Sequence, residues 1–289
     1  MSFQPLGFLS GLAYLALCLL IAASGARKKC RFDFSDPAEA STIGQLAGES
    51  GQPPPVSRSP KSSFLLSVSC LISLSSFLFM PCGTLPSLFP DAGGALIALG
   101  GLAAALGFRG CAAMRRQGCV ALCLGVSLAV IARYAQQRGV PGELYALDAY
   151  VAMPIVGVAE GGALPGVCIL ALASLFALRQ ASPARNANPL GGGEALLAAL
   201  AAELWMLAAI GFWVGLFFPF SFAFGQLSEV SALGGLALNA LVFWGKVLGL
   251  EWLLGKLREK WPHDTPRHAS ILVALLALGV WLLLDAAAG

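Results

Sequence analysis

Two charged residues lie deep within apolar stretches of the sequence, where they could carry protons or other ions. Glu203 stands in EALLAALAAELWMLAAIGF, and Lys246 stands in LALNALVFWGKVLGL. A charge inside a bilayer is costly unless it is paired or reaches water, so such residues often belong to ion pathways. Asn239 shares a helix face with Lys246, and Glu251 lies nearer the basic end of that stretch. Glu203, Lys246 and Glu251 are therefore candidates for a polar path, with a structural ion pair or a contact to another subunit as open alternatives.

The cysteines and histidines give little support to a metal or haem site. The eight cysteines form no CxxC pair, and Cys119 and Cys123, which share a helix face, have no histidine or carboxylate beside them. Both histidines, His263 and His268, fall in one loop, which excludes a haem held between helices by two histidines. No Walker loop, nucleophile elbow or HExxH occurs. The sequence thus predicts no metal and no cofactor in this chain.

The elements that must position these charges are membrane helices. Hydrophobic residues make up 57% of the chain and charged residues 11%, whereas soluble domains have about 25% charged residues. Because lipid offers no hydrogen bonds to the backbone, the predicted fold class is an all-α integral membrane bundle, one polytopic domain over 1–289. We count eight stretches that could cross about 30 Å of hydrocarbon: Leu6 to Ala26, Phe64 to Met80, Gly94 to Phe108, Gly118 to Ala135, Leu164 to Leu178, Glu194 to Phe218, Ser231 to Leu254 and Ala269 to Leu284.

Basic residues predict which side of the membrane each loop faces. Most of the 18 Lys and Arg residues fall in four short stretches: 27–61, 109–116, 179–185 and 256–267. Since cytoplasmic loops are rich in Lys and Arg, this alternation predicts eight crossings, both termini outside, and a long cytoplasmic loop at 27–62. A ninth crossing by Glu143 to Glu160 would reverse the last two basic stretches, so we expect that segment to be interfacial or re-entrant. No basic residue precedes the first span, which favours a retained anchor over a signal peptide.

The last third of the chain resembles a known family of membrane proteins. A span ends in FALRQASPARNANPL, and Glu194 then opens a span that ends in VGLFFPF. A long helix containing Lys246 follows, and the basic loop LREKWPHDTPR closes with Thr265, Pro266 and Arg267. This order resembles the subunit 1 family of respiratory complex I and the related membrane anchor subunits of energy-converting hydrogenases and formate hydrogenlyases. Family members also have eight crossings with both termini outside.

The resemblance implies a membrane anchor and coupling subunit of a redox assembly in the inner (cytoplasmic) membrane of the cell. Such a subunit carries no redox cofactor itself, docks a hydrophilic iron–sulfur, hydrogenase-like module on its cytoplasmic loops, and lies beside antiporter-like membrane subunits. The implied docking residues are basic: Arg115, Arg116, Arg185, Lys256, Arg258 and Arg267. Of the acidic run found in the family only Glu194 is present, so the expected proton or ion path is a degenerate one: Glu194, Glu203, Lys246 and Glu251.

Two functions of other classes stay open from the sequence. One is a small multi-pass transporter whose polar site uses Glu203 and Lys246, although no internal repeat of the kind found in many transporters is visible. The other is a membrane-bound lipid-modifying enzyme, for which His263, Asp264 and His268 would be the available polar cluster. The expected partners are protein subunits and the bilayer, with no nucleic acid.

Overall fold

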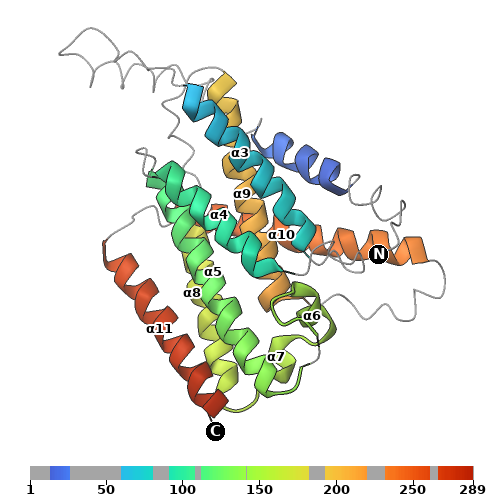
Figure 1. The fold of residues 1–289 in the computed structure, drawn as a ribbon, viewed down its shortest axis with the longest axis vertical. Coiled ribbons are helices and arrows are strands. Elements are labelled where there is room, and N and C mark those ends of the chain that lie inside the picture. Colours follow the sequence, from blue (N-terminus) through green and yellow to red (C-terminus); the bar gives the residue numbers. More distant parts are fainter. Residues whose placement is uncertain are drawn as a thin grey trace.

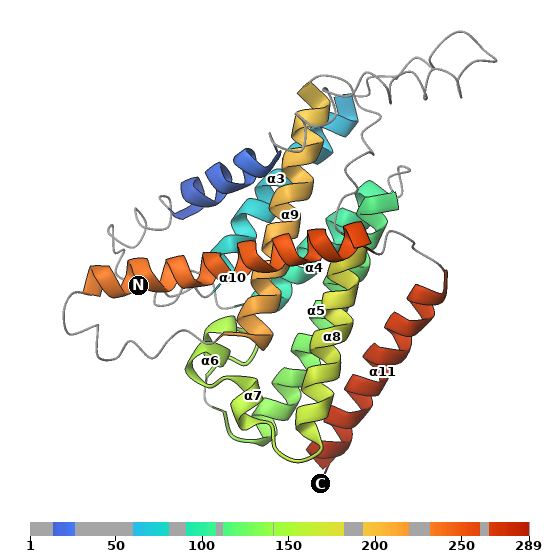
Figure 2. The same cartoon turned by 180° about the vertical axis from the view of Figure 1, so that it is seen from behind.

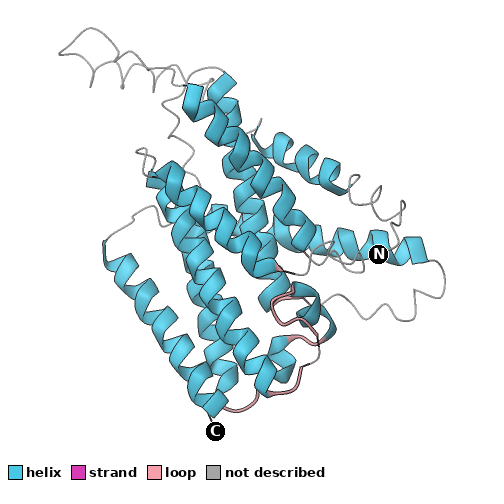
Figure 3. Ribbon diagram, viewed as in Figure 1, coloured by secondary structure: helices cyan, strands magenta, loops and turns pink. Residues whose placement is uncertain are grey.

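The computed structural model describes residues 14–26, 60–80, 91–107, 112–140, 142–181, 193–219, 232–260 and 266–288. Within these ranges the chain is built of helices and short connections, with no strand (Figure 3). The first described helix is Tyr14–Ala26. The others are α3 (Pro60–Ser76), η1 (Phe77–Phe79), α4 (Ala92–Gly107), α5 (Ala112–Gln137), α6 (Leu147–Ala152), α7 (Ile155–Val158), α8 (Ala163–Ala181), α9 (Gly193–Phe217), α10 (Ala232–Lys260) and α11 (Pro266–Ala288).

The predicted all-α membrane fold agrees with the lengths and compositions of these helices. Four stretches are long and apolar enough to cross a membrane: Arg116–Gln137, Ala163–Ala181, Ala199–Phe217 and Ser270–Ala288. Three shorter apolar helices fall on other expected spans: Tyr14–Ala26, Phe64–Phe79 and Ala92–Ala103. The total of eight crossings therefore stays a prediction.

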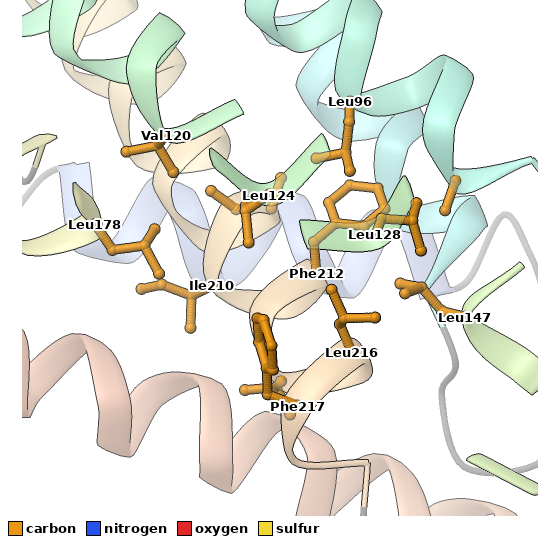
Figure 4. Close-up of a cluster of buried hydrophobic side chains, with 14 of the residues drawn as sticks. Leu96, Val120, Leu124, Leu128, Leu147, Leu178, Ile210, Phe212, Leu216 and Phe217 are labelled. Atoms are coloured by element: carbon orange, nitrogen blue, oxygen red, sulfur yellow. The ribbon is translucent and has the colours of Figure 1, made fainter. Parts of the chain in front are cut away.

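Helix α9 forms the centre of the bundle. Of the most apolar 18-residue stretch of α9, 83% is buried inside the protein. The corresponding share for α11, which lies at the edge of the bundle, is 17% (Figures 1 and 2). Figure 4 shows part of the core, where Phe212 and Leu216 of α9 lie among Leu96 of α4 and Leu124 and Leu128 of α5. Because α9 is apolar around nearly its whole circumference, other helices must cover it on most sides.

Glycines allow two helix pairs to approach closely. A Cβ atom added to Gly279 of α11 would lie 2.8 Å from Cγ of Leu170 in α8, and one added to Gly166 of α8 would lie 3.1 Å from Cγ of Leu283. A Cβ atom added to Gly100 of α4 would meet the Cβ of Ala121 in α5 at 3.0 Å. Small residues at such contacts are a common feature of helix packing in membranes, and here they hold α11 against α8.

The segment Glu143 to Glu160 folds as two short helices, α6 and α7, at one end of the bundle (Figure 1). Neither approaches the roughly 20 residues that a crossing requires. The backbone carbonyl of Tyr145 accepts a hydrogen bond from Ala92 N–H at 3.1 Å, and the Tyr150 hydroxyl donates to the Leu144 carbonyl at 2.7 Å. Burial raises the pKa of Tyr150, so its hydroxyl remains a donor. This geometry fits the expectation that the segment does not cross the bilayer as a single helix.

Helix α10 lies across its neighbours, a placement that the sequence pattern did not predict. It contains most of the expected span Ser231 to Leu254, yet Figures 1 and 2 show it running across α8 and α9, both of which it contacts, and not alongside them. Lys246, near the middle of α10, contacts Phe218 just beyond the end of α9. This contact fixes the middle of α10 at one end of the central helix.

Candidate functional site

Glu203 is the buried carboxylate around which the candidate site is built. Among the residues that the structure describes, Glu203 and Arg179 are the two charged side chains classed as buried, at 2% and 9% exposure. Glu203 lies on α9, the most enclosed of the membrane-length helices. Removing a carboxylate from water is costly, so its immediate surroundings decide what it can do.

The carboxylate of Glu203 lies against the last turn of the helix Tyr14–Ala26. A Cβ atom added to Gly25 would fall 2.5 Å from Glu203 Oε1 and 3.1 Å from Cδ, so a side chain at this position would force the Glu203 carboxylate to move. A helix ends in a partial negative charge, which disfavours a nearby carboxylate unless cations are close. The arrangement makes Glu203 a packing contact between α9 and the first described helix.

Helix α3 packs against α9 close to Glu203. Leu66 and Ala201 form a small buried cluster of their own, and the Cys70 thiol lies 4.0 Å from the Leu197 carbonyl as a weak hydrogen-bond donor. These contacts come from the turns of α9 just before Glu203. The carboxylate therefore lies at a junction where α3 and the helix Tyr14–Ala26 both reach α9.

Lys246 occupies a different position and forms different contacts. Its Nζ donates to the Phe218 carbonyl at 3.3 Å and lies 5.0 Å from the centroid of the Phe218 ring. Phe218 directly follows α9, so the ammonium group caps the negative end of that helix and gains a cation–π contact. This gives Lys246 a structural role that its position in the sequence did not indicate.

The two deep charges do not form one polar site. Glu203 lies in α9, and Phe218 directly follows that helix, fifteen positions later in the chain. At 1.5 Å per residue this separation is roughly 22 Å along the helix axis. Because Lys246 contacts Phe218, it lies at the C-terminal end of α9, whereas Glu203 lies near the middle of that helix. Glu251, one turn further along α10, is half-buried, whereas the side chains of Glu194 and Asn239 lie outside the described part of the chain.

One predicted docking residue, Arg116, lies at the end of the bundle where α5 begins and α8 ends. Arg116 Nη1 donates to the Gln180 carbonyl at 3.5 Å, and Arg179 is buried beside it in the last turn of α8. In the last turns of α10, Lys256 and Lys260 are exposed and Arg258 is half-buried. The side chains of Arg115 and Arg267, and the whole of Arg185, fall outside the described residues.

Arginine also occurs at the opposite end, with local partners. Arg133 Nη1 donates to Gln136 Oε1 at 3.4 Å, and Arg138 Nε donates to the Tyr134 hydroxyl at 3.1 Å. Exposed carboxylates share this end: Asp91, Glu143, Glu160 and Asp285. The described charges are thus mixed at one end of the bundle and mainly basic at the other.

Over the described ranges, no three or more His, Cys, Asp and Glu side chains group together in a way that could hold a metal ion. Cys119 is exposed and Cys123 buried on α5, and His263 and Asp264 lie outside those ranges.

Polar contacts between helices were not foreseen from the sequence. Trp205 Nε1 of α9 donates to the Leu99 carbonyl of α4 at 3.5 Å, and Trp213 Nε1 donates to the Ala171 carbonyl of α8 at 3.1 Å. The hydroxyls of Ser127 and Ser174 approach to 3.4 Å between α5 and α8. A tryptophan or serine in an apolar run carries no local signal of its partner, so only the three-dimensional fold reveals these contacts.

Comparison with known proteins finds no family model and no curated protein sequence that matches this chain.

Proposed function

We propose that this chain is the membrane anchor and coupling subunit of a complex I-like or hydrogenase-like redox assembly. Its cytoplasmic end would dock a hydrophilic iron–sulfur module, and antiporter-like membrane subunits would lie beside it. The observation that carries the proposal is a set of basic side chains on helices in contact: Lys256 and Lys260 are exposed on the last turns of α10, which contacts α8, and Arg116 of α5 donates to Gln180 near the end of α8. The resemblance of the last third of the sequence to the subunit 1 family of complex I supplies the identity of the partner class.

In this proposal, electron transfer belongs to the partner subunits. Iron–sulfur clusters would be held by the hydrophilic module, and this chain would position that module at the membrane surface. Helix α9 serves as the rigid centre, with Glu203 joining it to the first described helix and Lys246 capping its far end. Those two local roles support a degenerate ion path, because each charge already contributes to the packing of helices.

The alternative of a transporter with a joint Glu203 and Lys246 site gains no support from this geometry. A site that binds one substrate with both charges would need them within a few ångströms, but Glu203 lies near the middle of α9 and Lys246 contacts the residue just beyond its C-terminal end.

The assembly is tested by purifying the tagged chain from its native membranes in a mild detergent. We expect proteins with iron–sulfur and hydrogenase-like sequences to co-purify in a fixed ratio, with several iron atoms per copy of this chain. If the chain instead purifies alone, without iron, and moves a solute when reconstituted in vesicles, it is a transporter and the proposal is wrong.

The same proposal includes an orientation in the inner membrane, with eight crossings and both termini outside. Single cysteines placed at Ser57, Asp91, Asn186 and Pro262 in a chain lacking other reactive cysteines would report it. We expect a membrane-impermeant thiol reagent added from outside to label position 91 and to spare positions 57, 186 and 262. Labelling of position 186 from outside would mean that the segment Glu143 to Glu160 crosses the membrane.

A further inference from the structure

Arg138 is an exposed arginine whose side chain is held in place at the end of α5. Its Nε donates to the Tyr134 hydroxyl at 3.1 Å, and its guanidinium lies over the Tyr134 ring, 5.4 Å from the centroid. Tyr134 is 1% exposed, so the ring that supports the guanidinium is itself packed in the core. An arginine has five N–H donors in a planar fork. Within the described part of the chain only Nε is used, so the terminal nitrogens keep their donors for another group.

The last turn of α5 also fixes the backbone of Arg138. Its N–H donates to the Tyr134 carbonyl at 3.1 Å, and the Val140 N–H donates to the Ala135 carbonyl at 3.1 Å. Gly139 has a φ of 70°, the left-handed conformation that commonly closes a helix and that glycine adopts without strain. A residue whose backbone and side chain are already held loses little freedom on binding, so Arg138 is prepared to hold an anion.

Glu160 is an acidic neighbour of this arginine. Its backbone N–H donates to the Tyr134 hydroxyl at 3.5 Å, so residue 160 and the Arg138 guanidinium both lie within hydrogen-bond distance of one oxygen atom. The Glu160 side chain is exposed, and among the described residues no ion pair joins it to Arg138. Two opposite charges are thus held beside one tyrosine hydroxyl without neutralising each other.

We propose that Arg138 and Glu160 bind the head group of an aminophospholipid, a lipid that carries both a phosphate and a primary ammonium. The terminal nitrogens of Arg138 donate to phosphate oxygens, which the planar guanidinium matches in geometry, and the Glu160 carboxylate accepts from the ammonium. Helix α5 contains a membrane-length apolar stretch, Arg116–Gln137, so the residue that follows this stretch lies at the depth of the lipid head groups. The described charges at this end of the bundle are mixed, which suits a head group with both charges better than a purely anionic one.

The test measures lipids bound to the full chain by native mass spectrometry, after incubation with phosphatidylethanolamine and phosphatidylglycerol in equal amounts. We expect the wild type to bind phosphatidylethanolamine more tightly. Arg138→Gln should weaken binding of both lipids roughly tenfold, because the hydrogen bonds between guanidinium and phosphate are lost. Glu160→Gln should abolish the preference for phosphatidylethanolamine and leave phosphatidylglycerol binding undiminished. Arg133→Gln is the matched control: it removes the same charge from an exposed position of the same helix and should change neither lipid.

Equal binding of the two lipids by the wild type would overturn the proposal, and so would a preference that survives Glu160→Gln. Equal losses in the Arg133→Gln and Arg138→Gln variants would also overturn it, because the lipids would then respond to overall charge and not to a site. Glycerophosphoethanolamine, which has the same head group without acyl chains, should compete only weakly. Competition as strong as that of the lipid would assign the site to a soluble phosphate ester and overturn its assignment to a lipid.

This site lies at the end of the bundle opposite Arg116. Its loss should therefore leave docking of the hydrophilic module unchanged, and the lipid measurements stand or fall separately from the proposed function.

Discussion

Gly25→Ala is expected to destabilise the protein by about 1–3 kcal/mol, although alanine is ordinarily the better helix former. The new Cβ would lie 2.5 Å from Glu203 Oε1, too close for the two atoms to coexist without movement. Glu203 is buried, so its carboxylate would have to shift within packed surroundings. The measurement is the thermal unfolding midpoint of the purified variant in detergent, compared with that of the wild type.

Gly125→Ala is the matched control, because a Cβ atom added to Gly125 in α5 would meet no atom within 4 Å. This variant should be neutral or slightly more stable. Shortening the acid with Glu203→Asp in the Gly25→Ala background should recover part of the lost stability, since the two changes compensate each other in space. Equal losses in the two glycine variants, or no recovery in the double variant, would show that Glu203 does not pack against Gly25.

Local sequence patterns predicted where several of the apolar helices lie in the chain, because such a pattern depends only on residues that are close in sequence. The apolar runs at 118–135 and 269–284 correspond to α5 and α11, and Asp148 and Pro154 marked the segment that folds as two short helices. The direction of α10 could not be predicted in this way. An apolar run of 24 residues, Ser231 to Leu254, has the length of a crossing, but its direction is set by contacts with other helices, such as that of Lys246 with Phe218, which neither stretch shows alone.

The candidate site was predicted in part. Sequence reasoning identified Glu203 as a deep charge, and the structure buries it. The contact between Gly25 and the Glu203 carboxylate was not predicted, because a glycine in a run of small residues does not show which side chain packs against it. A shared site for Glu203 and Lys246 was considered because both lie in apolar runs, but depth in a run does not tell how far apart the two charges lie along α9. The complex I-like function rests on the resemblance and on the basic end of the bundle.

Charge reversal at that basic end tests the docking proposal most directly. Lys256 and Lys260 are exposed on the last turns of α10, so Glu at both positions should leave the fold intact and repel an acidic partner surface. Exposed ion pairs contribute about 0–1 kcal/mol each, so two reversals together should weaken docking by about 1–2 kcal/mol, or roughly 5- to 30-fold. The difference from the wild type should shrink with added salt, because salt screens both the attraction that is removed and the repulsion that is introduced.

The decisive measurement is the amount of hydrophilic iron–sulfur module that co-purifies per copy of this chain from native membranes. We predict a several-fold loss for the Lys256→Glu, Lys260→Glu double variant. The control carries Arg133→Glu and Arg138→Glu at the opposite end of the bundle and should retain the wild-type amount. An undiminished module in the Lys256→Glu, Lys260→Glu variant, or an equal loss in both variants, would contradict the assignment of the basic end as the docking surface.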